Sequence, residues 1–229
     1  VRGIFVYDSL SGTVNELTEG LIYCPYDEND IHFSFQIANE VVAFMATRAG
    51  GDEPCATDRN FFTAATNGQN LREISNGLVE MPGPKPLSPD GTTIGFAASD
   101  GHDIELYVAD VATSVHTQLT KNSDDEIEYP IACTGGRWAF PSFDGTNFEV
   151  YLFTPGEAIR ALTAGQTHFF NLYWNPNCTK LAFQGIENST AVSEIYIYTI
   201  HGPADGTLTR ITENGQDEDL LSDPWNPAF

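Results

Sequence analysis

Basic residues are scarce in this sequence. Ten Lys and Arg residues stand against 32 Asp and Glu residues, which gives a formal net charge of −22 at pH 7. Such acidity opposes binding to nucleic-acid phosphates and to anionic membrane surfaces. It favours a cationic partner, a metal ion or solubility alone. We therefore expect a basic protein or peptide partner, with no role for nucleic acid.

Long apolar runs are also missing, because no stretch of 18 consecutive apolar residues occurs in the 229 residues. The sequence therefore predicts no membrane insertion. It starts at Val1 without a signal-like apolar segment, which fits either a processed mature protein or a trimmed chain. This length suits a single all-β domain.

Several short sequence motifs of catalytic, phosphate-binding and metal-binding sites are also absent. There is no Gly-x-Ser-x-Gly nucleophile turn, no Gly-rich phosphate loop before a helix and no Asp-x-Asp-x-Asp-Gly calcium loop. The five histidines form neither His-x-x-x-His nor His-Glu-x-x-His, although imidazole in general suits zinc, copper and iron. The sequence therefore has no EF-hand-type calcium loop and no local histidine motif for a metal.

What the sequence does contain is a repeat, seen most completely from Ser88 to Thr120. Ser88-Pro-Asp-Gly91 is followed by the apolar run Ile94–Ala98, a polar turn through Asp100 and Asp103, and the alternating run Ile104–Val108. Pro-Asp-Gly and Asp-Gly are turn formers, and short runs of Ile, Tyr, Phe and Val between turns predict antiparallel strands. The unit therefore predicts a four-stranded meander.

The same unit recurs along the chain. Its second strand ends on Phe44, Phe96, Phe140 and Phe183, and it closes on a Leu/Ile-Thr/Ser pair, at Leu17-Thr18, Ile74-Ser75, Leu119-Thr120, Leu162-Thr163 and Ile211-Thr212. A four-stranded period of about 40–50 residues is typical of a β-propeller. We predict an all-β fold, a β-propeller.

These residues resemble the TolB-type (PD40, WD40-like) propeller repeat. The full Ser-Pro-Asp-Gly occurs once, and degenerate copies lie at Cys133-Thr-Gly-Gly136, Asn175-Pro-Asn-Cys178 and Gln36-Ile-Ala-Asn39. The resemblance implies a propeller fold over nearly the whole chain, and TolB-type propellers include periplasmic interaction domains. It says little about function, because one fold serves scaffolds, binding domains and enzymes.

The repeats divide the chain as a single propeller domain of five blades, each with about four antiparallel strands. One blade is composite, because residues 1–20 supply outer strands and residues 213–229 supply an inner strand in which Trp225-Asn-Pro copies Trp174-Asn-Pro. The other four blades span residues 21–75, 76–120, 121–163 and 164–212, which we call the second to fifth repeats. Pairing of the termini would close the ring and remove exposed edges. A slice of a larger propeller is the alternative.

The repeat register predicts how four cysteines pair. Cys24 and Cys55 fall on one face of the second repeat, whereas Cys133 and Cys178 fall in equivalent turns of neighbouring repeats on the opposite face. Pairs across faces would exceed the Cα separation of ~7 Å that a disulfide permits. We predict Cys24–Cys55 and Cys133–Cys178 in a secreted or periplasmic protein, with four reduced thiols in a cytosolic protein as the rival. Sequons at Asn177 and Asn188 are possible glycosylation sites, at the frequency expected by chance.

Acidic residues gather in the loops that enter the first strand of each blade. Asp30 and Glu126 occupy the same repeat position, and Asp219 falls one position away. These loops converge at one mouth of a propeller channel, where oxygen ligands from several loops suit Ca²⁺. The predicted metal-binding or partner-binding residues on this acidic face are Asp30, Glu126, Glu128, Asp219, His32 and His168. The alternative is a set of solvated loop residues.

Two functions remain open. One is a non-catalytic binding or scaffold propeller of TolB-like type, whose acidic face binds a cation, a metal ion or a basic protein. The other is a carbohydrate-active hydrolase or lyase that uses carboxylates or a His/carboxylate metal site at the channel mouth, as some larger propellers of similar repeat do. The sequence identifies no catalytic residue.

Overall fold

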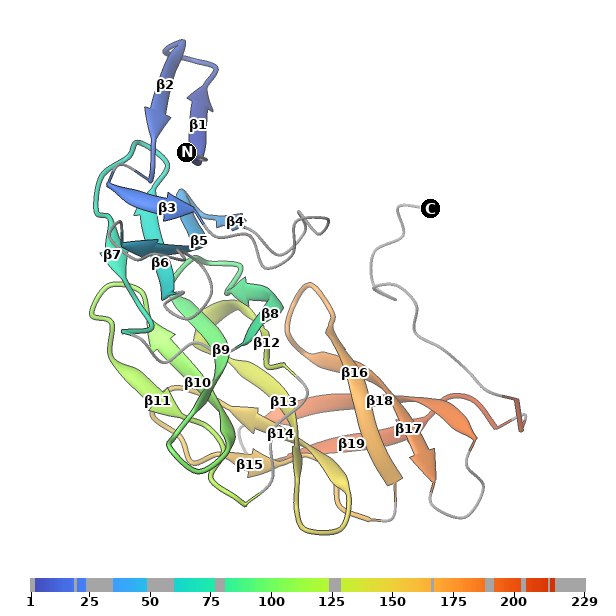
Figure 1. The fold of residues 1–229 in the computed structure, drawn as a ribbon. Helices are drawn as coiled ribbons and strands as arrows, with labels where there is room; N and C mark the ends of the chain where they lie inside the picture. The colour runs from blue at the N-terminus through green and yellow to red at the C-terminus, as the bar shows by residue number, and fades with distance from the viewer. Residues whose placement is uncertain are drawn as a thin grey trace. The chain divides into compact units, whose positions relative to one another are not determined.

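A computed structural model describes most of the chain as β-strands joined by short turns (Figure 1). The described residues are 3–18, 20–23, 35–48, 60–76, 81–123, 129–165, 167–187, 192–202, 205–213 and 215–216. Over these ranges the one helical element is the short 3₁₀ turn η2 (Thr134–Gly136). No helix in the same ranges has the length and hydropathy needed to cross a lipid bilayer.

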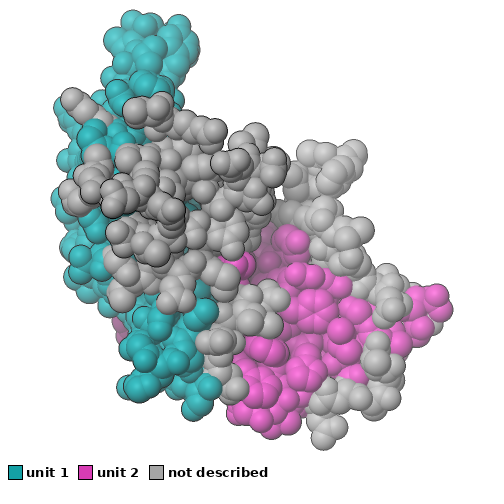
Figure 2. All heavy atoms as spheres, in the orientation of Figure 1, with its two compact units in different colours: residues 1–125 teal, residues 126–229 magenta. Residues whose placement is uncertain are grey.

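The chain divides into two compact units, residues 1–125 and residues 126–229 (Figure 2). Each is described by itself. Within both units the sheets are antiparallel, and each follows the boundaries of one sequence repeat.

The first unit holds three sheets. A two-stranded sheet pairs β1 (Phe5–Asp8) with β2 (Thr13–Glu16). The second repeat forms the sheet β3-β5-β6-β7, with β4 also paired to β5; its strands are β3 (Leu21–Tyr23), β4 (Phe35–Ala38), β5 (Val41–Arg48), β6 (Asn60–Ala65) and β7 (Arg72–Glu73). The third repeat forms β11-β10-β9-β8, from β8 (Met81–Leu87), β9 (Thr93–Ser99), β10 (Ile104–Asp110) and β11 (His116–Gln118).

The second unit holds two four-stranded sheets. The fourth repeat comprises β12 (Ile131–Ala132), β13 (Trp138–Phe143), β14 (Phe148–Phe153) and β15 (Arg160–Ala161). The fifth comprises β16 (Thr167–Trp174), β17 (Lys180–Glu187), β18 (Ser193–Gly202) and β19 (Asp205–Arg210). In both sheets the strands pair in chain order, which is the meander that the sequence predicts.

One stacked aromatic pair recurs in the four larger sheets. The phenylalanine predicted to end the second strand lies directly opposite an aromatic residue of the third strand, and the two rings stack with centroids 5.8–6.3 Å apart. The pairs are Phe44–Phe62, Phe96–Tyr107, Phe140–Tyr151 and Phe183–Tyr196. This pair gives every repeat the same register between its two central strands.

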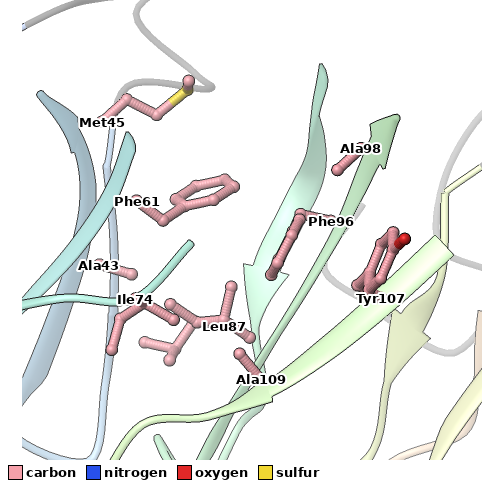
Figure 3. Packing of buried hydrophobic residues seen from close by; sticks show 10 residues of the cluster. Ala43, Met45, Phe61, Ile74, Leu87, Phe96, Ala98, Tyr107 and Ala109 are labelled. Carbon is pink, nitrogen blue, oxygen red and sulfur yellow. The ribbon is translucent and has the colours of Figure 1, made fainter. Parts of the chain in front are cut away.

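The central strands are buried on both faces because sheet packs against sheet. In the first unit Phe61 of β6 and Phe96 of β9 meet with ring centroids 6.0 Å apart, and Met45, Ile74 and Leu87 fill the space around them (Figure 3). In the second unit the β14 side chain of Val150 lies in one cluster with residues of β16, β17 and β18. Nearly continuous apolar strands such as Ile94–Ala98 follow from this two-sided burial.

The Ser-Pro-Asp-Gly turn is rebuilt by the Asn-Pro-Asn-Cys copy. The Ser88 hydroxyl accepts the Thr93 N–H at 3.0 Å, and the Asn175 side-chain oxygen accepts the Lys180 N–H at 2.8 Å. Gly91, at φ +72°, closes the first turn, and a Cβ there would lie 2.7 Å from the Ala38 carbonyl oxygen. Cys178 takes the same place with φ +59°.

Cys133 and Cys178 are joined by a disulfide, with Cα atoms 6.0 Å apart. This is the second pair that the repeat register predicts, and it links the fourth and fifth repeats. The first pair, Cys24 and Cys55, lies outside the described residues, as do Asn188 and the C-terminal segment 217–229 that is predicted to close the ring. Asn177 is exposed in the turn that holds Cys178, and its side-chain oxygen accepts the Thr179 N–H at 3.3 Å.

Candidate metal centre

In each repeat, a hydrogen bond joins the start of the third strand to the side-chain hydroxyl of the closing Thr or Ser. That hydroxyl accepts a backbone N–H from the first inward residue of the strand, at 2.8–3.0 Å. The pairs, N–H donor first, are Ile4–Thr18, Phe61–Ser75, Leu106–Thr120, Val150–Thr163 and Ile195–Thr212. We call this contact, together with the acidic or amide side chain just before the donor, the clasp.

The clasp continues through the residue that precedes the donor. The Thr163 hydroxyl donates to Glu149, and the Ser75 hydroxyl donates to Asn60 at 3.2 Å. The other Glu149 oxygen accepts the Gly165 N–H at 2.8 Å, so both oxygens of this buried carboxylate have partners. In the first repeat the position is Gly3, where a Cβ would lie 2.8 Å from the Thr18 hydroxyl. Glu149 therefore has a structural role, because hydrogen bonds from neighbouring residues satisfy both oxygens of its carboxylate.

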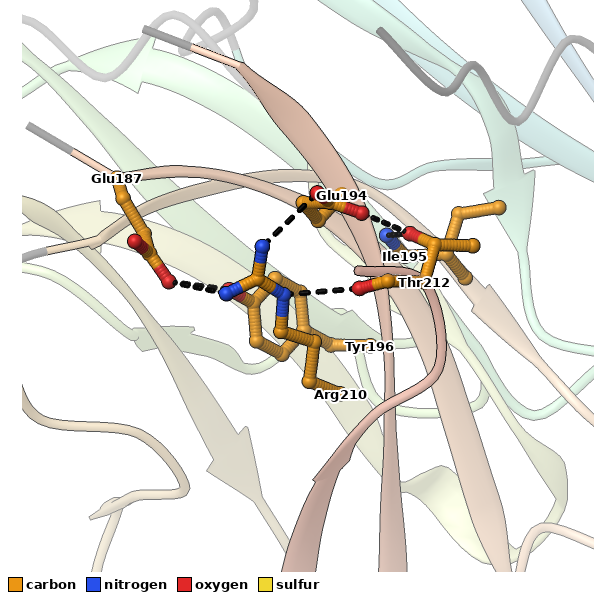
Figure 4. A network of polar contacts seen from close by, with 6 residues as sticks. All are labelled: Glu187, Glu194, Ile195, Tyr196, Arg210 and Thr212. Atoms are coloured by element: carbon orange, nitrogen blue, oxygen red, sulfur yellow. Dashed lines mark hydrogen bonds and ion pairs between the residues drawn. The ribbon is translucent and has the colours of Figure 1, made fainter. Parts of the chain in front are cut away.

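In the fifth repeat the clasp also contains a cation (Figure 4). The Arg210 guanidinium donates to Glu194 and to Glu187, both at 2.8 Å, and the Thr212 hydroxyl donates to the second oxygen of Glu194. Arg210 also donates to the Thr212 carbonyl at 2.8 Å. Glu194 is 1% exposed, so its charge depends on these partners.

This arrangement predicts how the fifth repeat responds to acid. The Thr212 hydroxyl, followed by Arg210, lowers the pKa of Glu194 below its unfolded value of 4.5. A carboxyl with a lowered folded pKa contributes stability above the unfolded pKa, and that contribution is lost as the pH falls through the folded pKa. We therefore expect Glu194→Gln to lower the free energy of unfolding above the unfolded pKa of 4.5, and the difference from the parent chain to shrink as the pH falls through the lower folded pKa. Urea unfolding across that range measures it. A difference that stays constant with pH would contradict a role for the ionised carboxylate.

The third repeat departs from this pattern at Glu105. This side chain is fully buried, at 0% exposed. One oxygen, Oε1, accepts the Asn122 N–H at 2.9 Å, whereas Oε2 has no hydrogen-bond partner among the described residues. A buried carboxylate oxygen without a partner is costly.

Two further carboxylates come from the β9–β10 hairpin. Asp100 follows β9, and its Oδ1 accepts the His102 N–H at 3.0 Å, while the Asp100 N–H bonds to the Asp103 carbonyl at 3.1 Å. These turn bonds turn both aspartates back toward β10. One oxygen from each of Asp100, Asp103 and Glu105 lies within 4.8 Å of the others, and Asp103 Oδ1 is also buried without a partner. Carboxylate oxygens at this spacing are the ligands that a hard cation takes.

The strand register shows what the third repeat has in place of the arginine. Gln118 lies opposite Tyr107, as Arg210 lies opposite Tyr196. Asp100 corresponds to Glu187, because each follows the stacked phenylalanine by four residues. The third repeat therefore has both acids of the fifth, one further acid in Asp103, and a neutral amide at the position of the guanidinium.

The electrostatics of the cluster reflect this missing positive charge. Burial is the main cause that raises the pKa of Glu105, and Asp103 and Asp100 raise it further, while the Thr120 hydroxyl and the Asn122 N–H oppose the shift. Burial and the same three carboxylates raise the pKa of the Tyr107 phenol. The Gln118 side chain lies against Asp100, but its amide nitrogen makes no well-formed hydrogen bond to a described residue.

Of the metal-binding or partner-binding residues predicted from the sequence, the structure describes only His168. Asp30, His32, Glu126, Glu128 and Asp219 are outside the described residues. His168 belongs to β16 rather than to the loop before it, and its Nδ1 accepts the Phe148 N–H at 3.4 Å. The acids that the structure brings together, Asp100, Asp103 and Glu105, were not among the predicted ligands. Their spacing, Asp-x-x-Asp-x-Glu, is a local signal that could have drawn attention to the hairpin.

Sheets of four antiparallel strands, repeated along the chain with one register, define the architecture of a β-propeller. Comparison with solved structures finds β-propeller proteins. TolB from Acinetobacter baumannii matches with a TM-score of 0.54 at 17% identity, over 92% of this chain and 48% of that one. Dipeptidyl peptidase 4 from Porphyromonas gingivalis matches with a TM-score of 0.61 at 15% identity, over 93% of this chain and 37% of that one.

The β-propeller domain of the trilobed protease from Pyrococcus furiosus, which has an open velcro topology, matches with a TM-score of 0.52 at 16% identity, over 79% of this chain and 57% of that one. These similarities concern the fold, and the chain spans about half the length of the Acinetobacter TolB. No protein-family model matches the sequence, and no curated protein matches it.

Proposed function

We propose that this chain is a non-catalytic binding propeller that recognises a positively charged group, either a metal ion or basic side chains of a protein partner. The observation that carries this proposal is the comparison between repeats. The fifth repeat neutralises the clasp acid Glu194 and the nearby Glu187 with Arg210, whereas the third repeat clusters three acids and has Gln118 at the arginine position. The negative charge of the third repeat is thereby available to a cation supplied from outside.

The net charge and the disulfide of the chain are both consistent with a role in binding cationic partners. The net charge of −22 attracts cationic partners over the whole surface. The disulfide between Cys133 and Cys178 supports a secreted or periplasmic location, since disulfides persist in oxidising compartments. A single propeller of five blades, closed by residues 213–229 beside residues 1–20, remains the architecture that we propose for the whole chain.

The test uses two kinds of cationic probe on the same protein. Binding of a fluorescent oligolysine peptide is followed by anisotropy, and binding of Ca²⁺ and Mg²⁺ is followed by calorimetry. We expect at least one of them to bind, and Asp100→Asn with Asp103→Asn to weaken it tenfold or more. Asp205→Asn, at an exposed acid of β19, is the matched control for the loss of surface charge. If neither probe binds more tightly to the parent chain than to the hairpin variant, the proposal is wrong.

A further inference from the structure

The cluster in the third repeat supports a more specific assignment, which rests on the proposed function. We infer that Asp100, Asp103 and Glu105 bind one calcium ion between the β9–β10 hairpin and the start of β10. The ion takes the role that the Arg210 guanidinium has in the fifth repeat. It is a structural ion of this hairpin.

The first support is the buried oxygen. Exposed acidic groups often cluster without a ligand, but Glu105 is fully buried and its Oε2 has no partner among the described residues. The equivalent carboxylates, Glu149 and Glu194, have partners at both oxygens. Glu105 thus has the same place in the fold as two satisfied acids. It differs from them because its Oε2 makes no well-formed hydrogen bond to a described residue, although the Thr120 hydroxyl is near enough to act on the carboxylate.

The second support is the internal comparison with Arg210. The fifth repeat has a positive group in contact with Glu187 and Glu194, at positions that correspond to Asp100 and Glu105. The register places Gln118 at the arginine position, so the side chain opposite Tyr107 is a neutral amide where the fifth repeat has a guanidinium. The same protein therefore shows that this location accepts a cation.

The ligand chemistry selects the ion. All three groups offer oxygen, and neither histidine nor cysteine belongs to the cluster, which favours calcium, magnesium or manganese over zinc or copper. Magnesium loses its water reluctantly, whereas calcium accepts 6–8 oxygens in irregular arrangements. Because two of the oxygens here are buried, the site suits an ion that gives up its water readily. The Gln118 amide oxygen and water are available as further ligands.

The experiment measures metal binding directly. Terbium, which replaces calcium and emits when a nearby tyrosine absorbs light, reports on the site through Tyr107. We expect saturable terbium emission that calcium displaces and magnesium displaces poorly. Tyr107→Phe should reduce the emission without changing the calcium affinity. Calcium at a hundredfold excess over its Kd should raise the melting temperature by about 5–10 °C.

Three variants distinguish calcium binding at this site from a general effect of charge. Gln118→Arg supplies the fifth-repeat cation, so it should abolish calcium binding and raise the melting temperature measured in chelator. Glu105→Gln should also abolish the calcium response. Glu149→Gln, at the equivalent acid of the fourth repeat, should lower the melting temperature but keep the calcium-dependent rise.

Three outcomes would overturn the assignment. They are the absence of saturable calcium or terbium binding, retention of the full calcium response in Gln118→Arg, and its loss in Glu149→Gln. Oligolysine binding that survives while calcium binding is absent would leave the proposed function standing and reject the ion. Failure of both probes would reject the two together.

Discussion

Replacing both Cys133 and Cys178 with serine should lower the free energy of unfolding by about 4 kcal/mol. The bridge closes a segment of 45 residues, and the chain-entropy estimate for a loop of that length is about 4 kcal/mol. The double variant avoids a single free thiol. Its stability is measured by urea unfolding under non-reducing conditions, where the slope of the transition also reports on the compactness of the unfolded chain.

Repeating the measurement in the presence of a reducing agent tests whether Cys24 and Cys55 also form a disulfide. If Cys24 and Cys55 form a disulfide, reduction should destabilise the double variant further. If they do not, reduction should leave the double variant unchanged and lower the parent chain to its level. Equal stability of the oxidised parent chain and the double variant would show that the bridge contributes nothing measurable.

The second large effect is expected at Phe96. Its side chain is 0% exposed and contacts both Phe61 of the neighbouring sheet and Tyr107 of its own, with ring centroids 6.0 and 5.8 Å away. Phe96→Ala removes a ring from the centre of this cluster and leaves a cavity, which costs about 3–5 kcal/mol in comparable cores. Phe96→Leu should cost less, because more of the volume is retained. Thermal and urea unfolding measure both.

Phe5 provides the matched control. It is the same residue type on β1, but it is 57% exposed in the structure. Phe5→Ala should therefore change the free energy of unfolding by no more than about 0.5 kcal/mol. A loss comparable to that of Phe96→Ala would contradict the exposure of the Phe5 side chain.

The sequence predicted the fold through features that act locally. The turn at Ser88 to Gly91 and the strands that contain Phe96, Phe140 and Phe183 form as predicted, because turn chemistry and strand pattern do not depend on distant contacts. The predicted strand ends are wrong, since the three strands continue past the phenylalanines to Ser99, Phe143 and Glu187. The pairing of Cys133 with Cys178 followed from the repeat register. The position of His168 was less well predicted, since the boundary between a polar loop and the first residues of a strand is not marked by hydrophobicity.

The cluster at the β9–β10 hairpin could not be predicted in the same way. Glu105, Glu149 and Glu194 look alike in sequence, each followed by an apolar residue and a tyrosine. What separates them is the set of hydrogen-bond donors around each carboxylate, which is known only from the structure. Glu149 and Glu194 have donors at both oxygens, whereas Glu105 Oε2 has none among the described residues.

The clasp also bears on how repeats of this kind diverge. The hydrogen bond between the closing hydroxyl and the backbone N–H of the third strand lies within one repeat in the third, fourth and fifth repeats. A substitution in the clasp of one repeat therefore leaves the hydroxyl hydrogen bonds of the other repeats unchanged. The clasp of the third repeat keeps the hydrogen bond from the Leu106 N–H to the Thr120 hydroxyl, although Gln118 occupies the position that Arg210 has in the fifth repeat. Because the other repeats keep their own contacts, one repeat can lose its arginine and bind a cation from solution instead. A repeat protein can thereby acquire a ligand while its fold stays the same.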